Sequence, residues 1–211
     1  MGPCRIAQRN QSWHLLSDQE RADVVQLARQ AIALGKDDPD ALSWAGQTIA
    51  YLTGHHAAAA RAIDRALTLN QNSAGAWLVR GWVECWQNRP GLAIQALERA
   101  MRLSPLGQEG HGLKTLLACA HLAAGRYEEA MYWADEALYE RPEGVPAIRL
   151  KAISCGLLGR IEEGKKWLAR LLQLTPGATV NRFNIEMSTF MAPEIRAVMA
   201  DGLRKAGMPE E

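Results

Sequence analysis

The sequence predicts an all-α fold, a right-handed α-α superhelix of about four helix-turn-helix repeats with a capping helix at the C-terminal end. The first observation is periodic: an apolar pair is followed about four residues later by a turn or a proline. These pairs lie 34, 37 and 34 residues apart, at Ala66-Leu67, Ala100-Met101, Ala137-Leu138 and Leu171-Leu172. Spacing of this size is typical of helical arrays, which bury their core between neighbouring repeats.

The second observation is the pattern inside one repeat, residues 73–106. Ser73 signals the start of a helix over 74–86, and an Asn-Arg-Pro turn separates this helix from a second one over 91–103. The second helix has apolar residues at the i, i+3 and i+4 spacing of a helix that packs on one side. Each repeat is therefore expected to be a helical hairpin.

The same signals place the other repeats at 39–72, 107–143 and 144–177, so that the array spans 39–177. The expected helices are 39–52 and 56–69, then 113–123 and 127–140, then 145–158 and 161–174. Three extra residues at the start of the third repeat account for the 37-residue step.

The two ends of the chain are expected to differ from the repeats. Residues 1–38 are interpreted as a degenerate N-terminal repeat with a helix over 18–34. Residues 178–211 are interpreted as a linker, irregular as far as Ala192, and a capping helix over 194–206. A cap is expected because the last repeat would otherwise leave an apolar face in water.

The linker is rich in apolar side chains that have no place in the repeat pattern. They are Val180, Phe183, Ile185, Met187, Phe190 and Met191. Packing near the last helix is the favoured interpretation. Occupation of the groove as an internal ligand and a bridge to a second copy are the alternatives.

Five residues of the second repeat carry a family resemblance. Trp77, Gly81, Ala93, Ala100 and Pro105 resemble the pattern of the tetratricopeptide repeat (TPR). In the fourth repeat two of the pattern's small alanines are replaced. The resemblance implies a TPR solenoid, whose small residues let the paired helices touch.

A closer resemblance covers most of the chain. The strings AWLVRGWVECW, HLAAGRYEEAMYWADEAL and DGLRKAGMPEE are similar to the C-terminal TPR region of bacterial, especially rhizobial, adenylate/guanylate cyclases and winged-helix regulators. This resemblance implies either the regulatory or sensory region of a longer protein or a short stand-alone relative. The sequence contains neither the paired aspartates on strands that a class III cyclase needs nor a GxxxxGK motif. We therefore expect that the chain is not an enzyme and has no catalysis of its own.

The first helix of each repeat is expected to line a concave groove. The groove-facing candidates are Gln47, Leu78, Trp82, Cys85, Trp86, Thr115, Cys119, Arg149 and Ile153. They predict an apolar and aromatic wall that binds a protein or peptide partner, with Trp82 and Trp86 as anchors and Arg149 facing a carboxylate. The competing interpretation is that the tryptophans only fill space between helices. Self-association into a homodimer is a further alternative.

Composition argues against other partners and cofactors. Twenty-four basic and 23 acidic residues give a net charge of +1, which disfavours nucleic acid, although RNA-binding helical arrays have similar periods. No apolar run is long enough to span a membrane, so we expect a cytoplasmic location. The four cysteines are scattered and are interpreted as reduced core thiols. If Cys85 and Cys119 lie on neighbouring first helices, a disulfide between them in an oxidising sample is the alternative. No metal site and no cofactor is expected.

Overall fold

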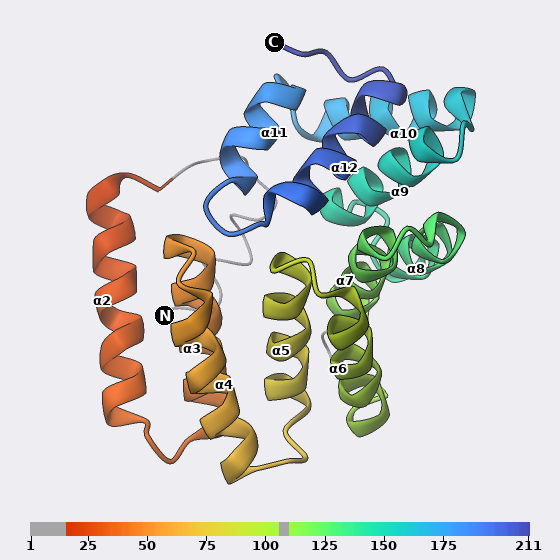
Figure 1. The fold of residues 1–211 in the computed structure, drawn as a ribbon. Coiled ribbons are helices and arrows are strands. Elements are labelled where there is room, and N and C mark those ends of the chain that lie inside the picture. Colours follow the sequence, from red (N-terminus) through yellow and green to blue (C-terminus); the bar gives the residue numbers. More distant parts are fainter. Residues whose placement is uncertain (1–15, 106–109) are drawn as a thin grey trace.

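The computed structural model describes residues 16–105 and 110–211, and within these ranges the regular structure is entirely helical (Figure 1). The helices are α2 (Asp18–Leu34), α3 (Pro39–Thr53), α4 (His56–Leu69), α5 (Ala74–Trp86), α6 (Pro90–Leu103), α7 (Gly110–Ala123), α8 (Tyr127–Glu140), α9 (Val145–Leu157), α10 (Ile161–Leu174), α11 (Val180–Met187) and α12 (Pro193–Lys205). The bounds of α2, α4, α5, α8 and α10 are those that the sequence predicts, and the other repeat helices differ by three residues or fewer.

Four hairpins, α3-α4, α5-α6, α7-α8 and α9-α10, make up the array. The turn inside each hairpin contains one residue in the left-handed region: Gly54, Asn88, Gly125 and Gly159, with φ angles of 69°, 55°, 74° and 73°. Their spacing repeats the 34-, 37- and 34-residue steps. Glycine adopts this conformation without a steric penalty and asparagine tolerates it, so the turn chemistry follows the repeat.

Side-chain caps start several of the helices. The Ser73 hydroxyl accepts a hydrogen bond from the Ala76 N–H, and Asp38 accepts bonds from the N–H groups of Asp40 and Ala41. Each cap satisfies a donor that has no partner within its own helix.

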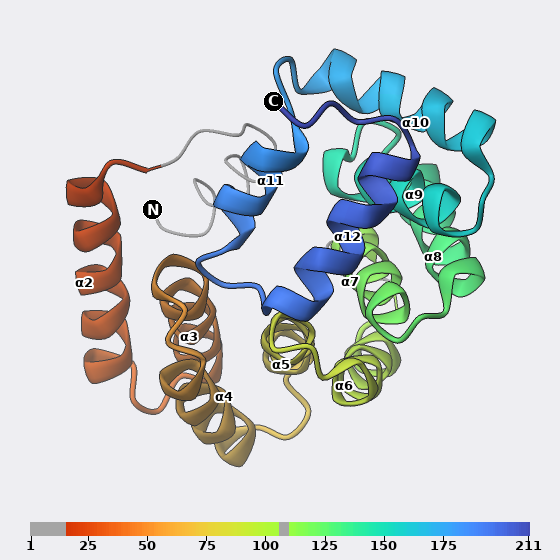
Figure 2. The same cartoon turned by 45° about the horizontal axis from the view of Figure 1, so that its top comes forward.

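The odd-numbered helices of the array lie on the inner side of its curve, and the even-numbered ones lie outside (Figure 2). The main hydrophobic core of the described residues runs from α3 to α12 and takes side chains from both the inner and the outer helices. A smaller cluster of Ala28, Ala45 and Ile49 attaches α2 to α3. The core is thus shared between neighbouring repeats, as expected for a solenoid.

The C-terminal unit differs from its predicted form. The stretch expected to be irregular contains the eight-residue helix α11, and the Thr179 hydroxyl accepts a hydrogen bond from the Arg182 N–H at its start. Val180 and Asn181 donate their N–H groups to the carbonyls of Pro209 and Glu210, at 2.9 and 3.1 Å. The first turn of α11 therefore has its donors satisfied by the cap and by the chain's C-terminal residues.

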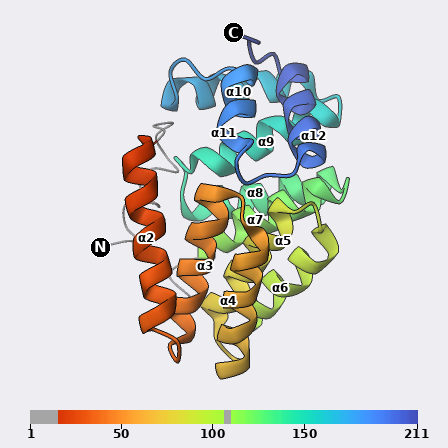
Figure 3. The same ribbon diagram turned by 60° about the vertical axis from the view of Figure 1, so that its left-hand side comes forward.

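Helix α12 packs against α9 and also contacts α10. Figures 1 and 2 place it inside the curve, with its N-terminal end toward α5 and its C-terminal end beside α9. Figure 3 shows α11 and α12 together at the end of the array that α9 and α10 form. The unit therefore covers the last hairpin and also fills part of the concave side.

Candidate binding groove

All nine predicted groove residues lie on α3, α5, α7 or α9, the helices that line the inner side (Figure 2). Gln47, Leu78, Cys85, Trp86, Cys119 and Ile153 are buried, and Trp82, Thr115 and Arg149 are half-buried. Five of the buried ones, Leu78, Cys85, Trp86, Cys119 and Ile153, belong to the hydrophobic core. The side chains that pack against this inner side come from the C-terminal unit, and the ring of Phe190 is one of them.

An aromatic cluster joins α3, α5 and the segment that precedes α12. The Phe190 ring lies 4.6 Å from the Tyr51 ring and 4.9 Å from the Trp86 ring, measured between centroids. Trp82 stands edge-on to Trp86 at 5.3 Å. Phe190 is only 6% exposed. Ring pairs at these separations add attraction to the hydrophobic gain from burial, so Tyr51 and Trp86 form a socket for one aromatic side chain.

Backbone contacts hold the segment that carries Phe190, which we call the linker segment (residues 188–192). The Ala192 N–H donates to the Trp86 carbonyl at 2.7 Å, near the end of α5 where carbonyls lack partners within the helix. A Cβ added at Gly54 would lie 2.4 Å from the Thr189 carbonyl oxygen, so the segment passes directly over the α3–α4 turn. The linker segment therefore contacts two repeats through both its backbone and its side chain.

The side chain of His56 also contacts the linker segment, through the backbone of Phe190. Burial lowers the pKa of His56, while a hydrogen bond with the Phe190 backbone raises it. The net direction is downward. A neutral imidazole is the form that fits this half-buried position.

Arg149 of α9 places a cation against α11. The Arg149 guanidinium lies 5.6 Å from the centre of the Phe183 ring of α11. Burial lowers the pKa of Arg149, and the Glu186 carboxylate opposes that shift. Burial raises the pKa of Glu186, which also forms an ion pair with Arg182 at 2.9 Å. The charge at Arg149 thus faces an aromatic ring and an acidic side chain, both from the C-terminal unit.

Two groove thiols touch. The Cys85 thiol on α5 donates to the Cys119 sulfur on α7 at 3.3 Å. Among the described cysteines, Cys85, Cys119 and Cys155 are all free. Of the predicted set, the structure therefore brings together the pairs Trp82–Trp86 and Cys85–Cys119.

Sequence reasoning missed Tyr51 and His56 as members of the site, and it named Phe190 only among the linker residues for which occupation of the groove was an alternative. Tyr51 lies 34 residues, one repeat, before Cys85, so projecting the period backwards would have found it. The period cannot place Phe190 between Tyr51 and Trp86, because the linker segment lies outside the repeat and its position depends on the fold of α11 and α12.

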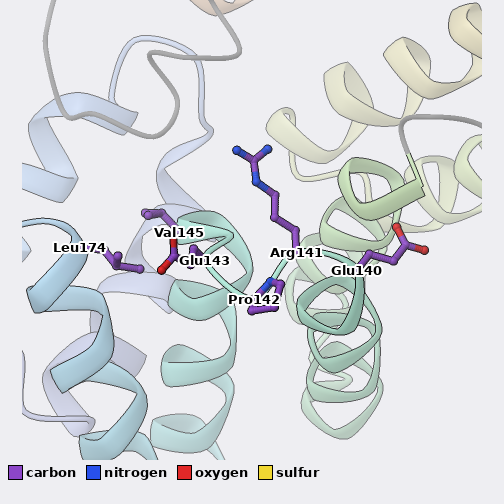
Figure 4. Close-up of a pocket in the computed structure, with 6 residues that line it drawn as sticks. All are labelled: Glu140, Arg141, Pro142, Glu143, Val145 and Leu174. Atoms are coloured by element: carbon purple, nitrogen blue, oxygen red, sulfur yellow. The ribbon is translucent and has the colours of Figure 1, made fainter.

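A separate hollow of about 440 Å³ lies at the α8–α9 turn and carries no function that we can assign. It is lined by Glu140, Arg141, Pro142, Glu143, Val145 and Leu174. Figure 4 shows these side chains spread along the turn, not converging on one point. Its charged groups are also engaged elsewhere: Glu140 with Lys114 at 2.9 Å and Glu143 with Arg170 at 3.3 Å.

The described residues contain no group of three or more His, Cys, Asp or Glu side chains placed to hold a metal ion. None of their helices is long and apolar enough to cross a membrane.

Comparison with known proteins identifies the fold. No family model matches the sequence, and no curated protein matches it. Solved structures do match. The type IV pilus biogenesis factor PilW has a TM-score of 0.69 at 15% identity, over 89% of this chain and 82% of PilW. MamA has a TM-score of 0.57 at 17% identity, over 74% of this chain and 85% of its own.

A third match is YrrB, described as a TPR protein with an unusual peptide-binding site. Its TM-score is 0.55 at 20% identity, over 85% of this chain and 90% of YrrB. At such low identities the likeness concerns the fold alone. The predicted all-α TPR solenoid is confirmed.

Proposed function

We propose that this chain is a protein-interaction scaffold whose concave groove binds an extended peptide segment with a large aromatic side chain. The observation that carries the proposal is the linker segment itself. It inserts Phe190 between Tyr51 and Trp86 and donates a backbone N–H to the end of α5, which are the two kinds of contact that a bound peptide makes. In this proposal the linker segment is an internal occupant that a partner displaces.

The burial and the chemistry of the site support a peptide over other ligands. The socket offers aromatic walls, which are common anchors at protein interfaces, and the Trp86 carbonyl at the end of α5, which accepts its hydrogen bond from the Ala192 N–H of the linker segment. Arg149 interacts electrostatically with Glu186 of the C-terminal unit, and an acidic residue of a partner that displaces this unit would take the place of that carboxylate. The net charge of +1 gives no support to nucleic acid as the partner.

A labelled peptide tests the proposal. We would use the chain's own sequence 186–194 as the probe, a control peptide with alanine in place of Phe190, and the full-length variant Phe190→Ala, in which the socket is vacated. Fluorescence anisotropy should show the probe binding this variant at least about ten-fold more tightly than it binds the unchanged chain, whose own segment competes. The alanine peptide should bind about ten-fold more weakly, because it lacks the anchor.

The second substitution Trp86→Ala in the same variant should abolish binding of the probe. Circular dichroism would verify that each variant remains helical. Equal binding of the two peptides, or no binding by a folded Phe190→Ala chain, would refute the peptide socket.

Self-association is the alternative form of the same proposal, in which the linker segment of one copy occupies the socket of another. Light scattering on the full chain distinguishes the two. A dimer that becomes a monomer on Phe190→Ala substitution would favour exchange between copies, whereas a monomer in both cases leaves the groove to a different partner.

A more specific proposal is that the chain is the regulatory region of a longer nucleotide cyclase or transcription regulator. It rests on the sequence resemblance alone. We expect no catalysis by this chain and a cytoplasmic location. A nucleotide cyclisation assay on it should show no turnover, and any turnover would contradict the assignment as a scaffold without its own chemistry.

A further inference from the structure

We propose that Cys85 and Cys119 form an oxidation site, at which hydrogen peroxide converts the two thiols into a disulfide that joins α5 to α7. The inference rests on the contact between the two thiols and does not depend on the proposed peptide binding. It concerns the coupling between the second and third repeats.

The geometry carries the proposal. The two sulfurs are 3.3 Å apart, and a disulfide bond is about 2.05 Å long, so they need to approach by only about 1.3 Å. Their helices, α5 and α7, are in direct contact, so neither repeat has to be rebuilt to bring the sulfurs together. Both side chains are held in the core, Cys85 at 0% and Cys119 at 9% exposure.

The surroundings assign different roles to the two cysteines. Cys119 is the more accessible of the pair. The hydrogen bond that Cys85 donates lowers the pKa of Cys119, and the positive charge of Arg149 lowers it further, while burial opposes both. The pKa of Cys85 is raised, first by that hydrogen bond and then by burial. Cys119 is therefore the attacking thiolate and Cys85 the thiol that resolves the intermediate.

The chemistry balances with peroxide as the oxidant. The Cys119 thiolate attacks one peroxide oxygen, so that an S–O bond forms, the O–O bond breaks, and hydroxide leaves as water after taking a proton. The product is a sulfenic acid on Cys119. The Cys85 sulfur then attacks the Cys119 sulfur, the S–S bond forms, and the S–O bond breaks with release of a second water. Two thiols lose two electrons in total, and the peroxide gains them.

The crosslink would restrain the groove. It closes a loop from residue 85 to residue 119 and so fixes how the second repeat is oriented on the third. Since Trp86 adjoins Cys85, the oxidised chain holds one wall of the aromatic socket in place. Disulfides of this loop length stabilise folded chains by restricting the unfolded state.

The test uses the full chain with Cys4→Ser and Cys155→Ser, so that only the pair remains. After treatment with peroxide the folded protein should lose both free thiols and about 2 Da of mass, for two hydrogen atoms. Tryptic digestion without reduction should yield peptide 81–99 linked to peptide 115–126. The melting temperature should rise by about 10 °C and return on treatment with dithiothreitol.

Two single variants assign the order of attack. With Cys85→Ser the reaction should stop at the sulfenic acid, which dimedone traps on Cys119. With Cys119→Ser, dimedone should label Cys85 at a rate at least about ten-fold lower, because its thiolate is disfavoured.

Three results would overturn the proposal. One is the absence of the linked peptide from the folded chain under conditions that oxidise the chain in denaturant. Another is linkage only between two copies, seen as a doubled mass. The third, in the unchanged chain, is faster alkylation of Cys155 than of Cys119, since burial raises the pKa of Cys155 to about 11.

Discussion

Helices α9 and α12 cross at Gly156 and Gly202, and they lie so close together that neither glycine has room for a methyl group. A Cβ at Gly156 would lie 2.2 Å from the Gly202 carbonyl oxygen, and a Cβ at Gly202 would lie 2.6 Å from Cγ2 of Ile153. The capping helix is thus seated on the last repeat by backbone contact. Because α12 and the linker segment are consecutive, this crossing also positions Phe190 in the groove.

Substitution of Gly156 by alanine should unseat α12. We expect Gly156→Ala to lower the free energy of unfolding by about 2–4 kcal/mol, because backbone atoms and not flexible side-chain ends obstruct the new methyl group. Gly112→Ala on α7 is the matched control: nothing lies within 4 Å of its added Cβ, and the change should stabilise by up to about 1 kcal/mol. Urea unfolding measures both, and equal effects would argue against the tight crossing.

Truncation of Phe190 should cost about 3–5 kcal/mol of unfolding free energy, since the ring is buried between two other rings. Ile185→Ala, in the adjacent α11, should change stability by less than about 0.5 kcal/mol because that side chain is 58% exposed. Tryptophan fluorescence should shift only for Phe190→Ala, as Trp86 gains contact with water. A neutral effect of Phe190→Ala would mean that the linker segment is not anchored.

The buried carboxylate of Glu84 should be a strong stability determinant. Its side chain is 2% exposed and pairs with the Nε atoms of Arg80 and Arg89 at 2.8 and 2.7 Å. Glu84→Gln leaves both arginines without their shared partner, and we expect a loss of about 2–4 kcal/mol. The exposed pair Arg102–Glu98, at 3.8 Å, provides the control: Glu98→Gln should cost less than about 0.5 kcal/mol in thermal or urea unfolding. Similar losses for the two variants would contradict this ranking.

Substitutions at the left-handed turn residues should lower stability according to how poorly the new residue adopts a positive φ angle. Gly125→Ala should cost about 1 kcal/mol even though open space surrounds the added Cβ, because φ is 74°. Gly125→Asn should cost less, since Asn88 occupies the corresponding turn of the second repeat at φ 55°. If alanine and asparagine are tolerated equally in urea unfolding, the turn does not impose the left-handed conformation in solution.

Stability should fall as the pH drops below about 6.5, the usual pKa of histidine. Burial lowers the pKa values of His56, His111 and His121 in the folded chain. Below pH 6.5 the unfolded chain therefore binds more protons than the folded one, so the contribution present at higher pH is lost as these groups titrate. Urea unfolding at pH 7.5 and 5.5 measures the difference in the free energy of unfolding. This difference should shrink in a variant with glutamine at all three positions. An unchanged difference would assign the pH dependence to other groups.

The sequence by itself determined the repeat architecture and, except for α11, the bounds of the described helices to within three residues. The reason is that these features are local: caps such as Ser73, turn residues such as Gly125 and the spacing of apolar side chains act within one or two turns of helix. The period also indicated which helices line the groove. Helix α11 was missed because an eight-residue segment is too short for a clear periodic signal.

Only the tertiary structure decided what fills the groove. The contact of Phe190 with Tyr51 joins residues 139 positions apart and depends on the close crossing at Gly156 and Gly202. The sequence anticipated that Cys85 and Cys119 could approach each other on neighbouring helices, but how α5 packs against α7 decided that the two sulfurs lie 3.3 Å apart. Such contacts arise when separate helices share one core, and the spacing of residues along a single helix does not encode which partners meet there.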